Sequence, residues 1–293
     1  MGDPETCRVV RFADTGWSDI AVTNALTARV LSGLGYKPQF AMLSLQVAYV
    51  AMKNSDVDVF LGSWIPSQKR MMEPLLKGEL IERLSPNLEN ARYSLAVMDY
   101  TYEAGLKKFG DVVKFKWELG SKIYGVEAGN EGNELIWSMI DSDAFGLRDF
   151  HLVESSEHAM LAEVDRMQRK KKHVVFLAWE PHPMNTKYSI RYLDGAVEGP
   201  AAAFGESTVY TSVRAGYSKD CPNVARLLRN IRFSIPMENE IMRMVIDDGM
   251  TPTVAAETWL KKNATVLEDW LIEVVSFNKQ PGLHAVKRSI GLE

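Results

Sequence analysis

Cysteine is scarce in this chain of 293 residues, which contains only Cys7 and Cys221. Two isolated cysteines cannot complete a structural zinc site, and neither lies in the local sequence context of a catalytic thiol. Two interpretations stay open, a pair of unrelated buried thiols or one disulfide between distant parts of the chain. A disulfide would indicate an oxidising compartment.

Long apolar runs and an excess of one charge are also missing. No stretch approaches the roughly 18 consecutive apolar residues of a membrane-spanning helix. The 34 Lys and Arg residues against 38 Asp and Glu give a net charge of -4, so no general basic surface for nucleic acid is expected. The basic run from Arg169 to His173 is expected to end a helix, where the helix dipole favours cations. The first residues, MGDPETC, are too short and polar for a signal peptide, so we expect the chain to begin at a mature terminus.

Motifs of catalysis and of nucleotide binding are absent as well. The sequence has no G-x-S-x-G, no H-E-x-x-H and no paired Cys and His, and its turn EAGNEGNEL matches neither a P-loop nor a dinucleotide fingerprint. Glu180, His182 and Asn185 in WEPHPMN could form a catalytic cluster, but the prolines on both sides of His182 favour a rigid loop. The sequence therefore favours a non-catalytic protein without a metal or a cofactor.

Alternating strands and helices dominate the first two thirds of the chain. With 46% hydrophobic residues the chain can bury two ordinary cores. A strand–helix alternation from Cys7 to about Leu84 and a second one from Tyr93 to Trp179 predict two α/β domains, each with a mostly parallel sheet flanked by helices. After Pro183 two extended segments are followed mainly by helices, which have no sheet of their own. We expect these helices to cover the first domain, which gives lobe A at residues 1–90 and 203–293 and lobe B at residues 91–202.

Aromatic residues lie where the predicted strands give way to loops. Trp17, Trp64 and Trp179 follow the short apolar runs RVVRFAD, VDVFLG and VVFLA, and Tyr93 lies in ARYSLAV. Ligands of open α/β sheets bind beyond the carboxyl ends of the strands. Aromatic ring faces at such a place suit a quaternary ammonium group, which offers no conventional hydrogen-bond donor and is bound by cation–π contact and shape. The other tryptophans lie in expected helices and are predicted to be core residues: Trp117, Trp137, Trp259 and Trp270.

Two polar residues beside these aromatics have two interpretations each. Asp19 lies at the expected start of a helix, where it could act as a cap or could neutralise a bound cation and accept a hydrogen bond from a hydroxyl group. Asn130 lies in the glycine-rich turn before another helix, where it could cap the helix or contact a ligand from the second domain. The residues themselves do not decide between these roles.

Several motifs, in this order and spacing, resemble the choline-binding proteins of bacterial ABC importers, within the glycine betaine/choline substrate-binding family. They cover nearly the whole chain and are GWSDI, DVDVFLGSWIP, KIYGVEAGNEGN, VVFLAWEPHPMN, VRAGY, CPNV and MENEIM. The resemblance implies a two-lobed periplasmic binding protein of type II with two hinge crossings, which closes around one ligand. It implies an aromatic box of Trp17, Trp64, Tyr93 and Trp179, contacts from Asp19 and Asn130 to the hydroxyl end of choline, and a disulfide between Cys7 and Cys221. This chain departs from close relatives at Ser63, where an Asn often precedes the Trp, and at Glu131, where Asp is common.

The resemblance also implies partners and a location. We expect a periplasmic, monomeric protein that binds choline and delivers it to the permease and ATPase of an ABC importer. Glycine betaine, carnitine or trimethylamine N-oxide remain alternative ligands of the same fold, and fine ligand preference stays open because both departures adjoin the expected site. A choline-ester hydrolase that uses His182 and Glu180 is an alternative of another class, but it would need a nucleophile that no motif supplies.

Overall fold

The first strand–helix alternation builds an α/β unit in the computed structural model, which describes residues 2–196 and 199–293. This unit 1 comprises the chain up to Trp64 together with Gln68–Glu89 and Thr208–Glu293. Its first elements are η1 (Glu5–Cys7), β1 (Val9–Asp14), α1 (Ser18–Gly33), β2 (Lys37–Met42), α2 (Leu45–Lys53), β3 (Val59–Ile65) and α3 (Lys69–Lys77). Strand β1 pairs in parallel with both β2 and β3, and the order of strands in this unit is β2-β1-β3-β9-β4.

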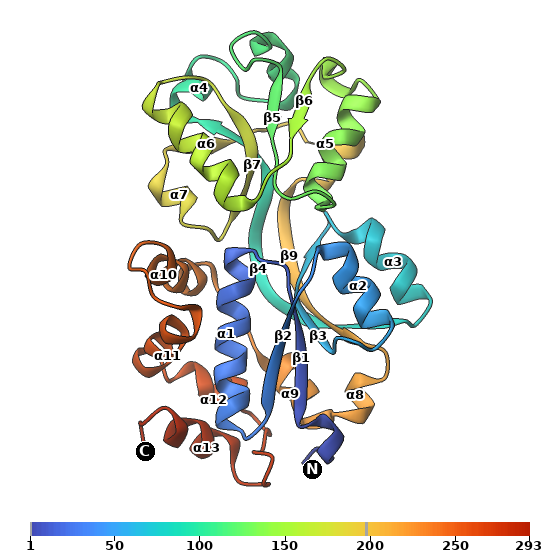
Figure 1. Cartoon of the computed structure of the whole chain (residues 1–293), viewed down its shortest axis with the longest axis vertical. Helices are drawn as coiled ribbons and strands as arrows, with labels where there is room; N and C mark the ends of the chain where they lie inside the picture. The colour runs from blue at the N-terminus through green and yellow to red at the C-terminus, as the bar shows by residue number, and fades with distance from the viewer. Residues whose placement is uncertain (1, 197–198) are drawn as a thin grey trace. The chain divides into compact units, whose positions relative to one another are not determined.

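Helix α1 explains why the C-terminal helices return to unit 1. Its sequence, SDIAVTNALTARVLSG, buries side chains around most of its circumference, so it needs cover on more than the face that packs on the sheet. Helices α10, α11 and α13 contact α1 and supply that cover (Figure 1). The C-terminal helices are α8 (Tyr217–Asp220), α9 (Pro222–Asn230), α10 (Ile235–Ile246), α11 (Pro252–Lys262), α12 (Val266–Trp270) and α13 (Gly282–Ser289).

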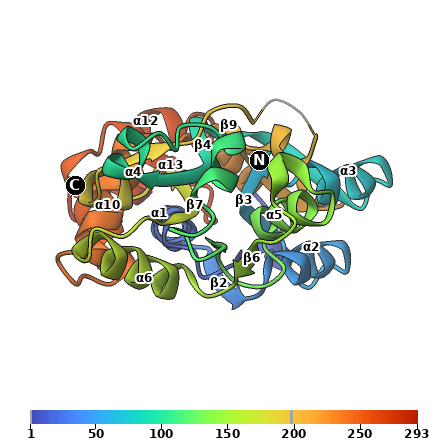
Figure 2. The same cartoon turned by 90° about the horizontal axis from the view of Figure 1, so that it is seen from above.

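Unit 2 comprises Ile65–Ser67 and Asn90–Ser207. Two strands, β4 (Ile81–Met98) and β9 (Gly205–Arg214), run across the boundary between the units. The elements between them are α4 (Asp99–Glu103), η2 (Phe109–Phe115), β5 (Lys122–Tyr124), α5 (Glu131–Asp141), η3 (Ala144–Gly146), β6 (His151–Val153), α6 (Glu157–Arg169), β7 (Val175–Glu180), α7 (Met184–Lys187), β8 (Ile190–Tyr192) and η4 (Gly199–Ala203). Helices α5 and α6 lie on opposite sides of β7 in both views (Figures 1 and 2).

The sheet of unit 2, predicted to be mostly parallel, contains both parallel and antiparallel pairs. Strand β5 pairs in parallel with β6 and β7, whereas β4 pairs antiparallel with β7 and with β8. In the β4–β7 ladder Tyr93 lies directly opposite Trp179. Opposite residues of an antiparallel pair place their side chains on the same face of the sheet, so the register alone brings these two rings together.

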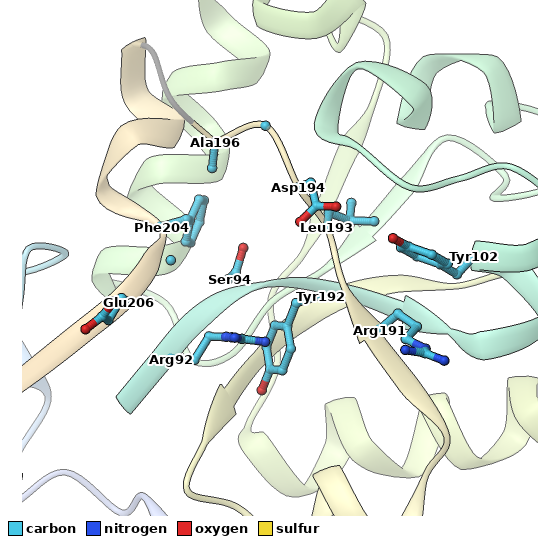
Figure 3. Close-up of a pocket in the computed structure, with 12 residues that line it drawn as sticks. Arg92, Ser94, Tyr102, Arg191, Tyr192, Leu193, Asp194, Ala196, Phe204 and Glu206 are labelled. Atoms are coloured by element: carbon cyan, nitrogen blue, oxygen red, sulfur yellow. The ribbon is translucent and has the colours of Figure 1, made fainter. Parts of the chain in front are cut away.

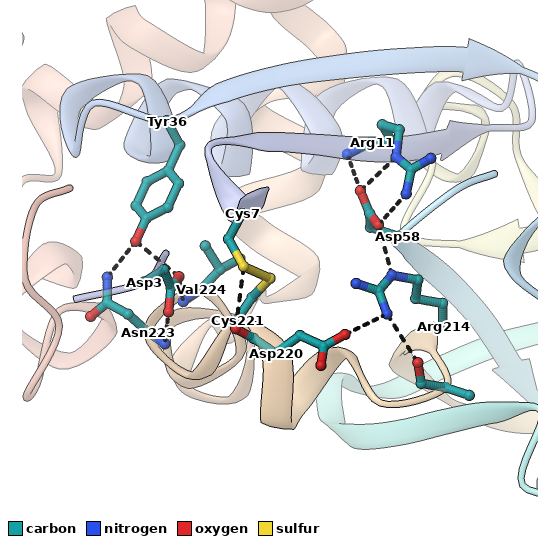
Figure 4. Close-up of a disulfide and its surroundings, with 11 residues drawn as sticks. Asp3, Cys7, Arg11, Tyr36, Asp58, Arg214, Asp220, Cys221, Asn223 and Val224 are labelled. Carbon is teal, nitrogen blue, oxygen red and sulfur yellow. Dashed lines mark hydrogen bonds and ion pairs between the residues drawn. A yellow bond between two sulfur atoms is a disulfide. The ribbon is translucent and has the colours of Figure 1, made fainter. Parts of the chain in front are cut away.

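A disulfide between Cys7 and Cys221 ties the N-terminal segment to α9 (Figure 4), with a Cα–Cα distance of 5.7 Å. The disulfide expected from the family resemblance is therefore confirmed. Beside it the Asp3 carboxylate accepts hydrogen bonds from the backbone N–H groups of Asn223 and Val224, at 2.7 and 3.0 Å. An acceptor at the first turn of α9 satisfies donors that have no partner within the helix.

A second polar cluster in unit 1 is centred on the buried carboxylate of Asp58. The Arg11 guanidinium donates to both of its oxygens, at 2.9 and 2.7 Å, and Arg214 donates to it at 3.0 Å (Figure 4). The hydrogen bond to Asp58 raises the pKa of Arg11 above its ordinary value. Two cations around one buried anion compensate its desolvation, and the bonds join β1 and β9 to the residue that directly precedes β3.

Two of the predicted core tryptophans are exposed instead. Trp259 and Trp270 are buried as predicted, but the Trp117 side chain is 85% exposed and Trp137 is 37% exposed. Trp117 lies in a turn after η2 rather than in a helix, so no amphipathic face turns it inward. None of the helices in the described part of the chain is long and apolar enough to cross a membrane.

Candidate functional site

Three of the six predicted ligand-binding residues meet in unit 2. The rings of Tyr93 and Trp179 have centroids 6.5 Å apart and planes inclined at 56°. The Tyr93 hydroxyl donates a hydrogen bond to Oδ1 of Asn130, at 2.8 Å. All three side chains are nearly buried, with 6%, 6% and 3% of their surface exposed. The structure thus assembles two ring faces and one amide within a single unit.

Asn130 caps helix α5, as one of its two interpretations predicts. Its Oδ1 accepts the backbone N–H of Gly132 at 2.8 Å, in addition to the hydroxyl of Tyr93. Gly132 allows this contact, because a Cβ at that position would lie 2.0 Å from the Tyr93 hydroxyl oxygen. A glycine at the second position of α5 therefore lets the tyrosine reach the cap.

The turn after β7 holds Trp179 through its backbone. Nδ2 of Asn185 donates to the carbonyl oxygens of Trp179 and His182, at 2.8 and 2.9 Å. Oδ1 of Asn185 in turn accepts the hydroxyl of Tyr192 at 2.8 Å. The side chain of Asn185 thus bonds within the turn through its nitrogen and joins the turn to β8 through its oxygen, which supports a rigid loop over a catalytic cluster for WEPHPMN.

Trp17 and Trp64 lie at the carboxyl ends of neighbouring parallel strands in unit 1. Trp64 is the penultimate residue of β3, and Trp17 is the N-cap residue of α1, three residues after β1 ends. Since β1 and β3 run in parallel, their carboxyl ends share one edge of the sheet, where α/β proteins place their ligands. Both side chains are buried, at 7% and 4% exposure.

Asp19 belongs to the first turn of α1 but is not its cap. The helix begins at Ser18, Trp17 is the N-cap residue and makes no side-chain capping bond, and Asp19 is only 4% exposed. A second carboxyl group, that of Glu238 in the first turn of α10, is 2% exposed. Burial, and then the charge of Asp19, raise the pKa of Glu238 well above its ordinary value.

A separate hollow of about 440 Å³ lies in unit 2 between β4, β8 and the start of β9 (Figure 3). The described residues that line it include none of the six predicted ligand-binding residues. The Arg92 guanidinium lies over the Tyr192 ring, at 5.0 Å from its centroid, and Arg191 pairs with Asp99. Phe204 lines the hollow and its ring centroid lies 5.8 Å from that of Tyr93, so Phe204 separates the hollow from Tyr93.

Comparison with known proteins identifies the family. Residues 8–262 match the model of the substrate-binding domain of ABC-type glycine betaine transport systems (OpuAC). This chain belongs to that family. Among solved structures, an ABC-transporter choline-binding protein in complex with choline is 44% identical, with a TM-score of 0.96 over 99% of this chain and 100% of that one.

An unliganded, semi-closed structure of an ABC-transporter choline-binding protein has the same 44% identity, with a TM-score of 0.90 over 98% of this chain and all of the other. An uncharacterised protein of Chromohalobacter salexigens, ORF1, is 46% identical over 129 residues, which cover 44% of this chain and 83% of that protein.

Membership of this substrate-binding family confirms the predicted fold class. The chain has the mixed α/β, two-lobed fold of periplasmic binding proteins. Proteins of this family bind substrates for ABC importers, act outside the cytoplasm and are not enzymes as a class. The described residues of this binding protein contain no group of three or more His, Cys, Asp or Glu arranged to hold a metal ion.

Sequence reasoning missed two buried acids of this binding protein, Glu157 and Glu238. Each lies in the first turn of a helix, where glutamate is common on the surface, and only the structure shows them to be 3% and 2% exposed. Their partners, His182 and Asp19, are distant in the sequence, so no local motif connects them.

Proposed function

We propose that this protein captures choline and delivers it to the permease and ATPase of an ABC importer. The observation that carries the proposal is the similarity, over 99% of the chain at 44% identity, to a choline-binding protein solved with choline. Under this proposal Trp17, Asp19 and Trp64 of unit 1 and Tyr93, Asn130 and Trp179 of unit 2 bind the same ligand molecule.

The chemistry of these side chains suits a trimethylammonium group. Its methyl groups spread the positive charge over a surface that donates no conventional hydrogen bond, so ring faces are the fitting partners. Each cation–π contact is worth about 0.5–1 kcal/mol when exposed and about 2 kcal/mol or more when desolvated, with Trp the strongest ring. The burial of Trp17, Trp64, Tyr93 and Trp179 supports the upper part of that range.

The carboxylate of Asp19 in unit 1 favours choline over its zwitterionic relatives. A carboxylate at Asp19 attracts the ammonium, accepts a hydrogen bond from the choline hydroxyl and opposes a second carboxylate. The raised pKa of Glu238 keeps that neighbour in its neutral form over a wider pH range, so a single negative charge is expected here.

Glycine betaine is the second candidate, because it is the ligand in the description of the matched family. The N-terminus of α5, capped by Asn130, would favour an anionic group such as the carboxylate of betaine. A helix end carries about half a charge, whereas Asp19 offers a full one, so we place choline first. Carnitine and trimethylamine N-oxide are further candidate ligands. For the alternative of a choline-ester hydrolase, no sequence motif supplies a nucleophile.

Calorimetric titration with choline, glycine betaine, carnitine and trimethylamine N-oxide tests the proposal. Choline is expected to bind most tightly, and the absence of heat with all four ligands would contradict the function itself. Replacing Asp19 by Asn removes the charge and keeps the size, so choline affinity should fall by about 1.5–3 kcal/mol, the range for a hydrogen bond to a charged group. Betaine affinity should stay level or improve, and a parallel loss for both ligands would show that Asp19 does not select choline.

The same proposal includes a periplasmic, monomeric protein. The Cys7–Cys221 disulfide supports an oxidising compartment, since such bonds persist outside the cytoplasm. Sedimentation of the purified protein with and without choline tests the monomer.

A further inference from the structure

We propose that Glu157 and His182 form a hydrogen-bonded pair that sets the orientation of the Trp179 ring for ligand binding. Both are positioning residues, which act on the ligand only through Trp179. The inference rests on the proposed function for its effect on affinity, but the orientation of Trp179 can be measured without any ligand. All three residues belong to unit 2.

The first step is the contact between His182 and Trp179. Their ring centroids are 5.2 Å apart and their planes are inclined at 70°, an edge-to-face arrangement. Tyr93 contacts Trp179 as well, with centroids 6.5 Å apart. Edge-to-face contacts of this kind are directional, so a change in the angle of the imidazole changes the preferred angle of the indole.

The second step is the way His182 itself is fixed. The backbone N–H of Met184 donates to Nδ1 of the imidazole at 2.9 Å, which leaves the ring proton on Nε2. Nε2–H then donates to Oε1 of Glu157 at 3.1 Å. With one bond on each nitrogen, both the tautomer and the rotation of the ring are defined.

The third step is the burial of the pair. His182 and Glu157 are 2% and 3% exposed, so water does not readily replace either partner. Glu157 is the first residue of α6, and the side chain of Ser156 caps that helix by accepting the N–H of Ala159. The Glu157 carboxylate is therefore held by helix α6. Its hydrogen bond fixes the imidazole of His182, and the imidazole in turn contacts the Trp179 ring.

A matched set of variants tests the pair. Glu157→Ala removes the acceptor, Glu157→Gln keeps an amide oxygen for Nε2–H, and His158→Ala changes an exposed histidine on the same helix as a control. Each protein is labelled with fluorotryptophan, and the ¹⁹F resonance of Trp179 is assigned with Trp179→Phe. Glu157→Ala should shift that resonance in the ligand-free protein and weaken choline binding roughly tenfold, the loss that corresponds to about one hydrogen bond. Glu157→Gln and His158→Ala should stay within about twofold of the wild-type affinity.

The outcomes separate the pair from the function. An unchanged Trp179 resonance and unchanged choline affinity in Glu157→Ala would overturn the inference. If neither the wild-type protein nor any variant binds choline, the proposed function is wrong. The ¹⁹F shift of Trp179 then still shows whether Glu157 affects the orientation of that ring. Should Glu157→Ala not fold, histidine ¹⁵N spectra of the wild-type protein decide instead, because His182 assigned as the Nδ1–H tautomer would refute the bond to Glu157.

Discussion

Glu238 shows how one buried residue links pH to stability. Its carboxyl group is 2% exposed, on helix α10, which contacts α1 where Asp19 lies. Burial, and secondly the charge of Asp19, raise its pKa well above the ordinary value of 4.5. A raised acid pKa means that the folded protein holds a proton that the unfolded chain releases more readily.

The sign of the resulting pH dependence follows from linkage. The contribution of Glu238 to stability is fully present below pH 4.5 and is lost as the pH rises through the raised pKa. Glu238→Gln keeps the size and removes the titration, so its free energy of unfolding relative to wild type should increase as the pH rises from 4.5 to the raised pKa and should then level off. Urea denaturation of both proteins across that range measures the difference, and a difference independent of pH would contradict the assignment.

The contact between β4 and α5 depends on the absence of one side chain. A Cβ on Gly132 would lie 2.0 Å from the Tyr93 hydroxyl oxygen and 2.9 Å from Leu177 Cδ1. Helix propensity alone would favour alanine over glycine by up to about 1 kcal/mol. Because the new methyl group must displace Tyr93 from Asn130, we expect Gly132→Ala to lower stability by about 1–3 kcal/mol instead, and to weaken choline binding.

Gly110→Ala is a suitable control in the same unit, since a Cβ there would meet its nearest neighbour, Phe145, only at 4.0 Å. Denaturation and calorimetry of both variants test the contact. A stabilised Gly132→Ala with normal affinity would mean that Tyr93 can move away without loss.

Local periodicity predicted most elements because it depends only on neighbouring residues. Strands β1, β3 and β7 lie close to the apolar runs RVVRFAD, VDVFLG and VVFLA. Helix α1 begins at Ser18, beside the expected start at Asp19, and α6 ends at Arg169, where the basic run begins. The N-terminal half of β4 was missed, since IERLSPNLEN lacks alternation and contains a proline. Strand β9 is a neighbour of β4 in the sheet, and Asn87 of this segment donates a hydrogen bond to the hydroxyl of Thr211 in β9. The helical pattern TPTVAAETWLKKNATVLEDWLIEV predicts one helix, but the structure has two, since α11 ends at Lys262 and α12 begins at Val266.

The sequence predicted those features of the site that depend on neighbouring residues, and missed those that depend on tertiary contacts. The residue types and the helix start at Asn130 were accessible from the sequence, and the cap is confirmed. The sequence did not predict that β4 runs antiparallel to β7, which pairs Tyr93 with Trp179, because strand direction depends on tertiary pairing. The binding of one ligand by all six residues stays a prediction, which the titrations test at Asp19.

The disulfide acts on a much larger scale than any single contact. Cys7 and Cys221 are separated by 214 positions and both lie in unit 1, so unit 2 is inserted within the closed loop. Closing a loop of that length restricts the unfolded chain and should stabilise the protein by about 2–5 kcal/mol in the chain-entropy model. The double variant Cys7→Ser, Cys221→Ser should therefore have a lower melting temperature, which calorimetry measures. An unchanged melting temperature would show that the disulfide does not stabilise the folded protein.

The same bond makes the stretch between the two cysteines a covalent ring, from which a short N-terminal tail and the longer C-terminal segment after Cys221 extend. A single backbone cut anywhere in this ring opens it but releases no fragment. A nicked molecule would thus keep its full mass until a reductant is added, and its two halves would stay together to refold. One disulfide therefore allows the molecule to undergo a first backbone cleavage within the ring without losing any part of the chain.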